Sequence, residues 1–187
     1  MKLKIAVLPG DGIGPEVTEQ TQKCLTAVAD IFGHDFSFKK AQVGAIAIEK
    51  SESPLPQETL DLCLASDAVL FGAIGDPKYD RNPDAKIRPE QGLLQLRQKL
   101  DLYSNIRPVK IFPTLIDKSP LKKEVIKVTD FVIYRELTGG IYFGEKKLST
   151  DGTLASDLCD YTEEEISRIS HLAFKAAKSR KQKLTLV

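Results

Sequence analysis

Three arginines and a tyrosine in this 187-residue chain have the chemistry to hold and transform a small anion. Arg97 lies in the stretch RPEQGLLQLR, Arg107 in NIRP, and Arg135 with Tyr142 in RELTGGIYFG. An arginine guanidinium is a permanently charged fork that can bind a carboxylate through two hydrogen bonds. A tyrosine hydroxyl can give or accept a proton. If their elements converge, these side chains predict an anion site; taken singly, each arginine is better explained as a surface ion pair and Tyr142 as packing.

The segment around Arg97 places charged and apolar side chains on one face of an expected helix. Glu90, Leu93, Leu94 and Arg97 are spaced i, i+3, i+4 and i+7, so they share one side. A carboxylate, two leucines and a guanidinium in a row are an unusual set for one helix face. Two alternatives stay open, because Leu93 also begins a leucine stripe suited to the core and Glu90 could cap the helix start.

A glycine-rich turn, LPGDGIGPEV, occupies residues 8–17 after an apolar run. Its glycines are spaced G-x-G-x-G, whereas a dinucleotide fingerprint needs G-x-G-x-x-G between a strand and a helix. The fingerprint also needs an acidic residue near the end of the second strand, where this sequence has Lys39 and Lys40. The pattern therefore favours a tight strand-to-helix turn over a Rossmann nucleotide site.

Apolar runs alternate with helix-like segments over the first hundred residues. Strands are predicted over 4–9, 36–43 and 67–75, and helices over 15–32, within 51–66 and over 92–102. This alternation is typical of an α/β layered fold with parallel strands. The charged, proline-rich stretch 76–91 is predicted to be a long loop, and such loops often carry function.

The pattern changes near residue 102. We therefore expect a domain boundary there, between domains of residues 1–102 and 103–187. Strands are predicted over 104–112, 129–137 and 183–187, hairpin-like strands over 138–159, and a helix over 162–181. Thr162 and Glu165 have the spacing of a capping box at the start of that helix.

Composition argues against several classes of protein. A net charge of +1 gives no field that would attract nucleic acid or an acidic membrane. No apolar run is long enough to cross a bilayer. The three cysteines lie far apart, which argues against a disulfide framework or a zinc site and favours a reducing, cytoplasmic location.

Four motifs, LPGDGIGPEV, RPEQGLLQLR, NIRP and RELTGGIYFGE, follow one another along the chain and together resemble the isocitrate/isopropylmalate dehydrogenase family. The spacing Glu-x-x-Leu-Leu-x-x-Arg is similar to that of its isopropylmalate branch. The resemblance implies an α/β fold, a layered and mostly parallel sheet flanked by helices, non-Rossmann and here truncated, with part of a second domain carrying a β arm over 139–160. It implies NAD-dependent oxidative decarboxylation of 3-isopropylmalate to 2-oxoisocaproate in leucine biosynthesis, assisted by Mg²⁺ or Mn²⁺, in a homodimer.

The resemblance also implies roles for single residues. Arg97, Arg107 and Arg135 would bind the carboxylates of the substrate, and Tyr142 would be the catalytic proton donor in the enol step. Leu93 and Leu94 would line the pocket for the isopropyl group, with Glu90 helping to choose the substrate. Cofactor contacts are implied at Ile13, Asp76, Pro77, Lys78 and Glu90.

Family members are longer than this chain, and their catalytic lysine and metal-binding aspartates are expected beyond Val187. Two hypotheses follow. The chain is the N-terminal half of an NAD-dependent isopropylmalate dehydrogenase, or it is a non-catalytic folding, dimerisation or dicarboxylate-binding module with an incomplete site. The arm 139–160 would pair with a partner subunit, and the alternative for it is an intramolecular hairpin.

Overall fold

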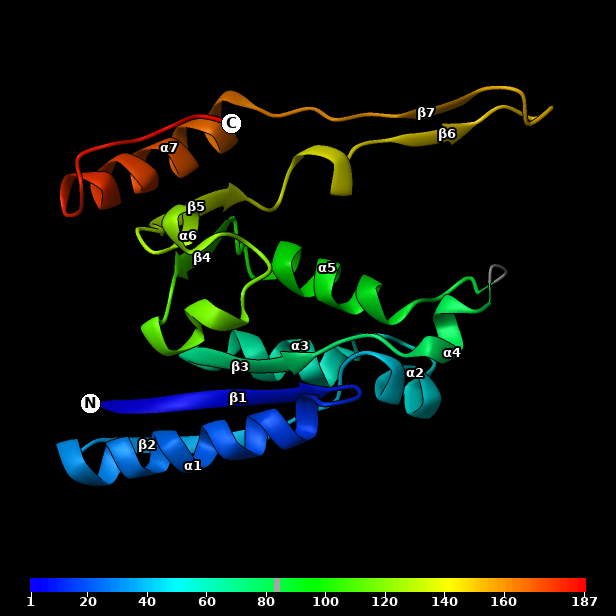
Figure 1. Ribbon diagram of the computed structural model, residues 1–187. Coiled ribbons are helices and arrows are strands. Elements are labelled where there is room, and N and C mark those ends of the chain that lie inside the picture. Colours follow the sequence, from blue (N-terminus) through cyan, green and yellow to red (C-terminus); the bar gives the residue numbers. More distant parts are fainter. Residues whose placement is uncertain (83–84) are drawn as a thin grey trace. The chain divides into compact units, whose positions relative to one another are not determined.

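The computed structural model describes residues 1–82 and 85–187, which form two compact units, residues 1–100 and 101–187 (Figure 1). The elements of the first unit are β1 (Lys2–Gly10), α1 (Gly14–Phe32), β2 (Asp35–Lys40), α2 (Ala45–Ser51), α3 (Gln57–Leu64), β3 (Ala68–Ala73), α4 (Pro77–Asp80) and α5 (Pro89–Lys99). The three strands and three helices expected here are confirmed, whereas α2 and α4 are additional.

The strands of the first unit form a parallel sheet in the order β2-β1-β3. Central β1 pairs with both neighbours, for example Leu3 with Phe36 and Leu8 with Phe71. Residues 5–8 of β1 are buried whichever way they point, since helices cover both faces of the sheet. The predicted parallel α/β architecture is therefore confirmed.

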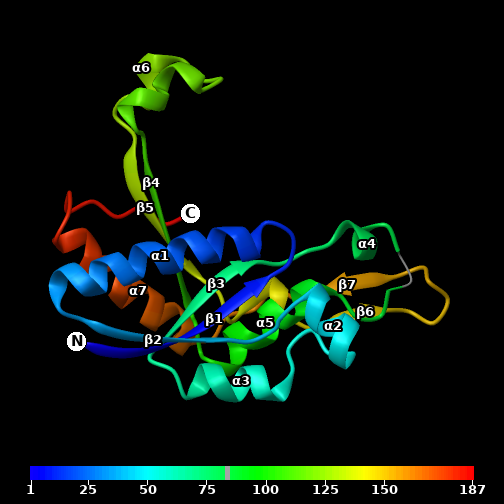
Figure 2. The same ribbon diagram turned by 90° about the horizontal axis from the view of Figure 1, so that it is seen from below.

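Helices cover the two faces of this sheet differently. Figure 2 shows α1 lying across the strands, and α1 contacts all three of them. Helices α3 and α5 supply residues to the hydrophobic core of the unit, which consists of Ala6, Leu8, Val43, Leu55, Cys63 and Leu96. Leu100 packs against this cluster, and Leu93 is half-buried outside it. Leu96 and Leu100 therefore belong to the core, as their stripe suggests, and Leu93 does not.

The glycine turn joins β1 to α1 through very close backbone contacts. A Cβ at Gly10, whose φ is +70°, would lie 1.9 Å from the carbonyl oxygen of Ala73, and one at Gly14 would lie 2.0 Å from that of Pro9. Side chains at either position would collide with backbone that cannot move aside. The glycines are therefore explained by the geometry of a tight turn, which the spacing predicts.

The second unit contains β4 (Ser104–Lys110), η1 (Pro113–Lys118), α6 (Lys123–Ile126), β5 (Asp130–Glu136), η2 (Gly140–Tyr142), β6 (Lys146–Leu148), β7 (Ala155–Asp157) and α7 (Glu163–Lys178). Strands β4 and β5 are antiparallel, as are β6 and β7. In Figure 2 the β4–β5 ribbon carries α6 at its far end. The strands predicted over 104–112 and 129–137 and the hairpin within 138–159 are confirmed.

The capping box of α7 is also confirmed. The Glu165 N–H donates to Thr162 Oγ1 at 3.2 Å, and Glu165 Oε2 accepts the Thr162 N–H at 2.7 Å. The strand predicted over 183–187 is wrong, because those residues are irregular. An apolar, β-branched run forms a strand only where a neighbouring strand accepts its hydrogen bonds.

Candidate functional site

Arg135 and Tyr142 lie side by side in the second unit. Strand β5 carries Arg135 near its end and η2 ends at Tyr142, so the chain turns back on itself between them. Arg135 Nη2 donates to Tyr142 Oη at 3.1 Å, and the guanidinium carbon lies 5.2 Å from the centre of the tyrosine ring. Because the guanidinium occupies one lone pair of this oxygen, the hydroxyl keeps its proton for another group. The pair can bind an anion and donate a proton beside it.

Arg107 shares a face of the β4–β5 ladder with Arg135. Asn105 pairs directly with Arg135, and Arg107 lies two residues further along the same strand. Alternate residues of a strand point to one face, so the two arginines are diagonal neighbours across the ladder. Both side chains are exposed. The second unit therefore places Arg107 and Arg135 on one face of the β4–β5 ladder, with Tyr142 against Arg135.

The other predicted substrate residues lie on α5 of the first unit. Glu90 is exposed in its first turn, and the three that follow on the same face, Leu93, Leu94 and Arg97, are half-buried. Gln91 Oε1 accepts the N–H of Arg88 at 3.1 Å. The helix start is thus capped by Gln91, and the alternative role of Glu90 as a cap is wrong.

Two loops with predicted cofactor residues meet at the carboxyl edge of the parallel sheet. Gly10 ends β1 opposite Ala73 of β3, and the Asp11 N–H donates to the Ala73 carbonyl at 2.7 Å. The turn with Ile13, which is 58% exposed, and the loop that leads to Asp76 therefore start at the same edge. In α/β sheets this is the edge where ligands usually bind.

The predicted cofactor residue Glu90 also lies near this edge. A Cβ at Gly75, in the loop after β3, would lie 3.3 Å from Glu90 Oε1. The first turn of α5 is thus beside the loop that leads to Asp76. Within the first unit, the structure places Glu90 beside the loop that follows β3.

Asp76 and Lys78 already have partners within the first unit. Asp76 accepts the Lys78 N–H at 2.8 Å at the start of α4, where Pro77 is the first residue. Lys78 Nζ lies 3.0 Å from Glu49 Oε1, and this hydrogen bond and charge raise the pKa of the lysine. Pro83 and Asp84 of the same loop lie outside the described residues.

A buried carboxylate that the sequence did not single out holds the carboxyl edge together. Asp11, 6% exposed, accepts the N–H groups of Ala45 at 2.9 Å, Ile46 at 3.1 Å and Gly75 at 3.1 Å. It therefore joins the glycine turn to the start of α2 and to the loop after β3. Its place between two glycines of the motif is the only signal that sequence offers for this role.

A second such carboxylate follows Arg135 directly. Glu136, whose side chain is 8% exposed, accepts hydrogen bonds from Thr138, Gly139 and Arg168. Burial raises its pKa, but these hydrogen bonds outweigh burial and hold it below the ordinary value of 4.5. The adjacency of Glu136 to a predicted substrate arginine is the signal that could have identified it.

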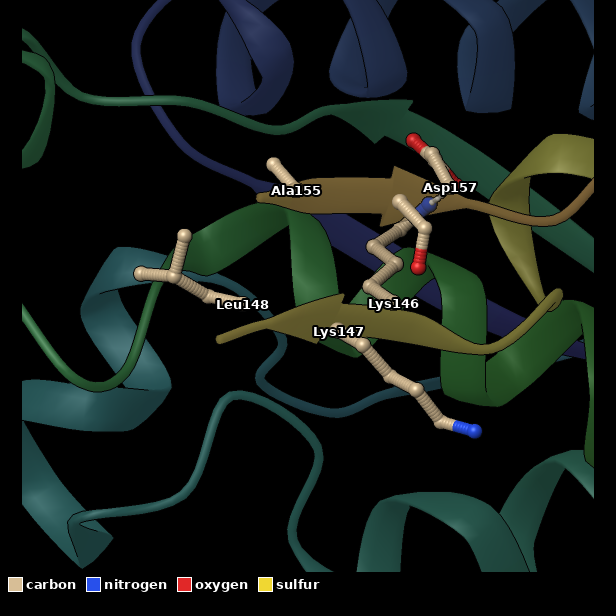
Figure 3. Close-up of a pocket in the computed structure, with 6 residues that line it drawn as sticks. Lys146, Lys147, Leu148, Ala155 and Asp157 are labelled. Atoms are coloured by element: carbon tan, nitrogen blue, oxygen red, sulfur yellow. Dashed lines mark hydrogen bonds and ion pairs between the residues drawn. The ribbon is translucent and has the colours of Figure 1, made fainter. Parts of the chain in front are cut away.

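A shallow hollow on the β6–β7 hairpin is a different kind of feature. Figure 3 shows Lys146 of β6 turned toward Asp157 of β7, with which it forms an ion pair. The lining residues are Lys146, Lys147, Leu148, Ala155, Ser156 and Asp157. None of them is a predicted substrate or cofactor residue, so the hollow belongs to the arm and not to the candidate site.

Residues 1–82 and 85–187 offer neither a metal-ion cluster nor a membrane-spanning helix. In this part of the chain no three His, Cys, Asp or Glu side chains gather where they could hold a metal ion. No helix there combines the length and the apolar character needed to cross a membrane.

The whole chain is similar to known dehydrogenases. The family model described as isocitrate/isopropylmalate dehydrogenase matches residues 4–187. The chain is 50% identical over 191 residues to the 3-isopropylmalate dehydrogenase of Bacillus subtilis (strain 168), covering 100% of this chain and 52% of that protein. It is 49% identical over 189 residues to the 3-isopropylmalate dehydrogenase of Aquifex aeolicus (strain VF5), with the same coverage. The chain thus spans about half the length of the curated relatives it matches.

Solved structures show the same fold. The isocitrate dehydrogenase from Methylococcus capsulatus superposes with a TM-score of 0.73 at 28% identity, over 95% of this chain and 48% of that one. A beta-decarboxylating dehydrogenase from Thermococcus kodakarensis gives a TM-score of 0.66 at 32% identity, over 95% of this chain and 46% of that one. The chain therefore has the fold of about half of each of these dehydrogenases.

Proposed function

Because the chain belongs to the isocitrate/isopropylmalate dehydrogenase family, we propose that it supplies the N-terminal half of a 3-isopropylmalate dehydrogenase. The reaction is the oxidative decarboxylation of 3-isopropylmalate to 2-oxoisocaproate, in leucine biosynthesis. The observation that carries this proposal within the structure is the contact between Arg135 and Tyr142, inside the motif RELTGGIYFGE.

In the proposed reaction, this chain's own residues bind the substrate and move one proton. Arg97, Arg107 and Arg135 bind its carboxylates, since each guanidinium offers two parallel N–H donors. Tyr142 donates its hydroxyl proton to the carbon that has lost carbon dioxide, and the enol oxygen releases its own proton to water, which gives the ketone. The tyrosinate then regains a proton from water. The hydrogen bond from Arg135 supports this role, because it leaves the tyrosine proton pointing elsewhere.

NAD and a divalent metal are the proposed cofactors. When bound, NAD would supply a hydride acceptor for the oxidation of the substrate hydroxyl. Ile13, Asp76, Pro77, Lys78 and Glu90 are proposed to contact it at the carboxyl edge of the sheet. Mg²⁺ or Mn²⁺ is a different case: the described residues hold no cluster of three metal-ligating side chains, so by themselves they do not form its site.

A titration of the chain with 3-isopropylmalate tests the proposed substrate site. The wild-type chain should bind it, and Arg97→Lys should weaken binding about tenfold, because the bidentate fork is lost. Arg180→Lys is the control, since Arg180 pairs with Asp130 and has no proposed ligand role. Equal affinities of wild type and Arg97→Lys would contradict the role of Arg97.

A NAD-reduction assay tests whether this chain is catalytic by itself. With 3-isopropylmalate, NAD and Mg²⁺, a polypeptide whose intact mass is 20.7 kDa should bind the substrate without turnover. Turnover by that polypeptide would show that no further residues are needed. Binding without turnover is the result expected both for the half-enzyme and for the dicarboxylate-binding module, and absence of binding would contradict both.

A further inference from the structure

The turn between β5 and η2 is organised around the carboxylate of Glu136. Its Oε2 accepts the N–H groups of Thr138 and Gly139, each at 2.8 Å. Its Oε1 accepts the Thr138 hydroxyl at 2.9 Å and Arg168 Nη2 at 2.9 Å. A carboxylate can accept about four hydrogen bonds, so this buried group is fully used. Glu136 therefore fixes the two residues that follow β5.

Arg168 connects this carboxylate to α7. Its Nη1 donates to Asp101 Oδ1 at 3.1 Å, and its guanidinium carbon lies 4.7 Å from the centre of the Tyr103 ring. Its Nη2 also contacts the Thr138 hydroxyl. The Arg168 guanidinium thus joins α7, the turn and the segment before β4. A lysine ammonium could not make all these contacts at once.

The rest of the turn has almost no room to move. A Cβ at Gly139 would lie 2.8 Å from Glu165 Oε1. Gly140 has a φ of +69°, and a Cβ there would lie 2.3 Å from the Tyr161 hydroxyl oxygen. The Gly140 N–H donates to the carbonyl of Asp160 at 3.0 Å. η2 begins at Gly140, so the same contacts determine where Tyr142 lies.

We propose that Glu136 is a positioning residue for the proposed reaction, holding the turn so that the Tyr142 hydroxyl stays against Arg135. This inference rests on the proposed function and adds to it a residue that touches neither substrate nor cofactor. Arg135 precedes the turn and Tyr142 follows it, so their separation depends on the path of the turn. A displacement of about 1 Å in a reacting group can cost about a hundredfold in rate, which is why such a turn needs a fixed anchor.

A spectroscopic test avoids any dependence on catalysis. In NMR spectra of the chain labelled at its tyrosines, the Tyr142→Phe variant identifies the ring signal of Tyr142. The Arg135→Lys variant shows where that signal moves when the contact with Arg135 is disturbed. In Glu136→Gln the signal should move in the same direction, and the amides of Thr138 and Gly139 should exchange about tenfold faster. The affinity for 3-isopropylmalate should fall about tenfold. Glu164→Gln, on the exposed first turn of α7, is the matched control and should change none of these.

Each outcome decides the role of Glu136. If the amides exchange faster while the Tyr142 signal stays as in the wild type, Glu136 only stabilises the turn and the inference is overturned. If the wild-type chain does not bind 3-isopropylmalate, the proposed function fails, and the tyrosine signal still shows whether Glu136 positions the pair. If circular dichroism shows Glu136→Gln unfolded, Arg168→Lys takes its place, because it keeps the charge and loses the fork.

Discussion

We propose that three side chains on α5 determine which substrate the proposed site prefers. Glu90 is exposed, and Leu93 and Leu94 are half-buried outside the core, so their apolar surfaces remain available to a ligand. Burying the isopropyl group of the substrate against the leucines contributes about 2 kcal/mol, at about 0.8 kcal/mol per carbon. An apolar pocket alone discriminates weakly, and the charge of Glu90 adds repulsion toward the additional carboxylate of isocitrate.

In a catalytically complete enzyme that contains this chain, Glu90→Ser combined with Leu94→Asn should therefore shift preference toward isocitrate about tenfold. The measurement is the ratio of kcat/KM for 3-isopropylmalate to that for isocitrate. Gln95→Asn is the control, because Gln95 is exposed on α5 and has no proposed ligand role. An unchanged ratio in the double variant would contradict the proposed pocket.

The pKa of Glu136 makes a prediction about pH. Burial raises this pKa, but the hydrogen bonds from Gly139, Arg168 and Thr138 together hold it below its ordinary value of 4.5. A carboxyl group with a lowered pKa in the folded state stabilises the protein above its unfolded pKa, and this contribution is lost as the pH falls through the folded value. The free energy of unfolding, measured with urea, should therefore fall more steeply below about pH 4.5 for the wild type than for Glu136→Gln. Parallel pH profiles would show that Glu136 contributes nothing to this dependence.

The sequence points to residues of the candidate site whose side chains could bind or protonate a ligand. It does not point to residues that would hold those side chains in place. The arginines and Tyr142 stand out because guanidinium and phenol groups can bind and protonate an anion. Glu136 looks like an ordinary charged residue until its partner Arg168, 32 positions later, is placed beside it. Contacts over such a separation depend on the fold, and no local pattern reveals them.

At the scale of elements, α2 depends on a residue far from it in sequence. Its first N–H groups, from Ala45 and Ile46, donate to Asp11, 34 and 35 residues earlier. The first N–H groups of a helix lack partners within the helix, so a carboxylate placed there stabilises its start. This explains why α2 was not predicted: its short sequence has no side-chain cap of its own.

Asp11→Asn should destabilise the first unit by about 1–3 kcal/mol, because one of its two acceptor oxygens becomes a donor and buried N–H groups lose their partner. Chemical denaturation followed by far-ultraviolet circular dichroism measures this change. Asp30→Asn, at an exposed position of α1, should change stability by less than about 0.5 kcal/mol. Equal unfolding curves for the two variants would contradict the role of Asp11.

Elements with a strong local sequence pattern can be predicted from the sequence. Elements that depend on a contact with a distant segment cannot. Strand β1 and helix α1 follow directly from an apolar run, a glycine turn and Pro15 in the first helical turn. Residues 183–187 have the composition of a strand but form none, since a strand also requires a partner. Periodicity thus fixes which segments can become strands, and pairing decides which of them do.

At the scale of the whole molecule, the β6–β7 hairpin within the arm 139–160 is short and strongly exposed. Each of its strands has three residues, and Leu148 and Leu154 are 70% and 68% exposed. An isolated two-stranded hairpin is at best marginally stable in water. Unpaired strand edges with exposed leucines are suited to pairing with another chain. These features suit the pairing with a partner subunit that the family resemblance implies for residues 139–160.

Light scattering should therefore give a mass of twice 20.7 kDa for the wild-type chain. Leu148→Lys combined with Leu154→Lys should shift the chain to the monomer, because lysines on an exposed strand edge prevent pairing by charge and by the hydration of their amines. Leu115→Lys is the matched control, since Leu115 is 57% exposed in η1 and lies outside the arm. A dimer that the arm variant leaves intact would mean that another surface makes the interface. A wild-type chain that is monomeric throughout would contradict pairing of the arm between subunits.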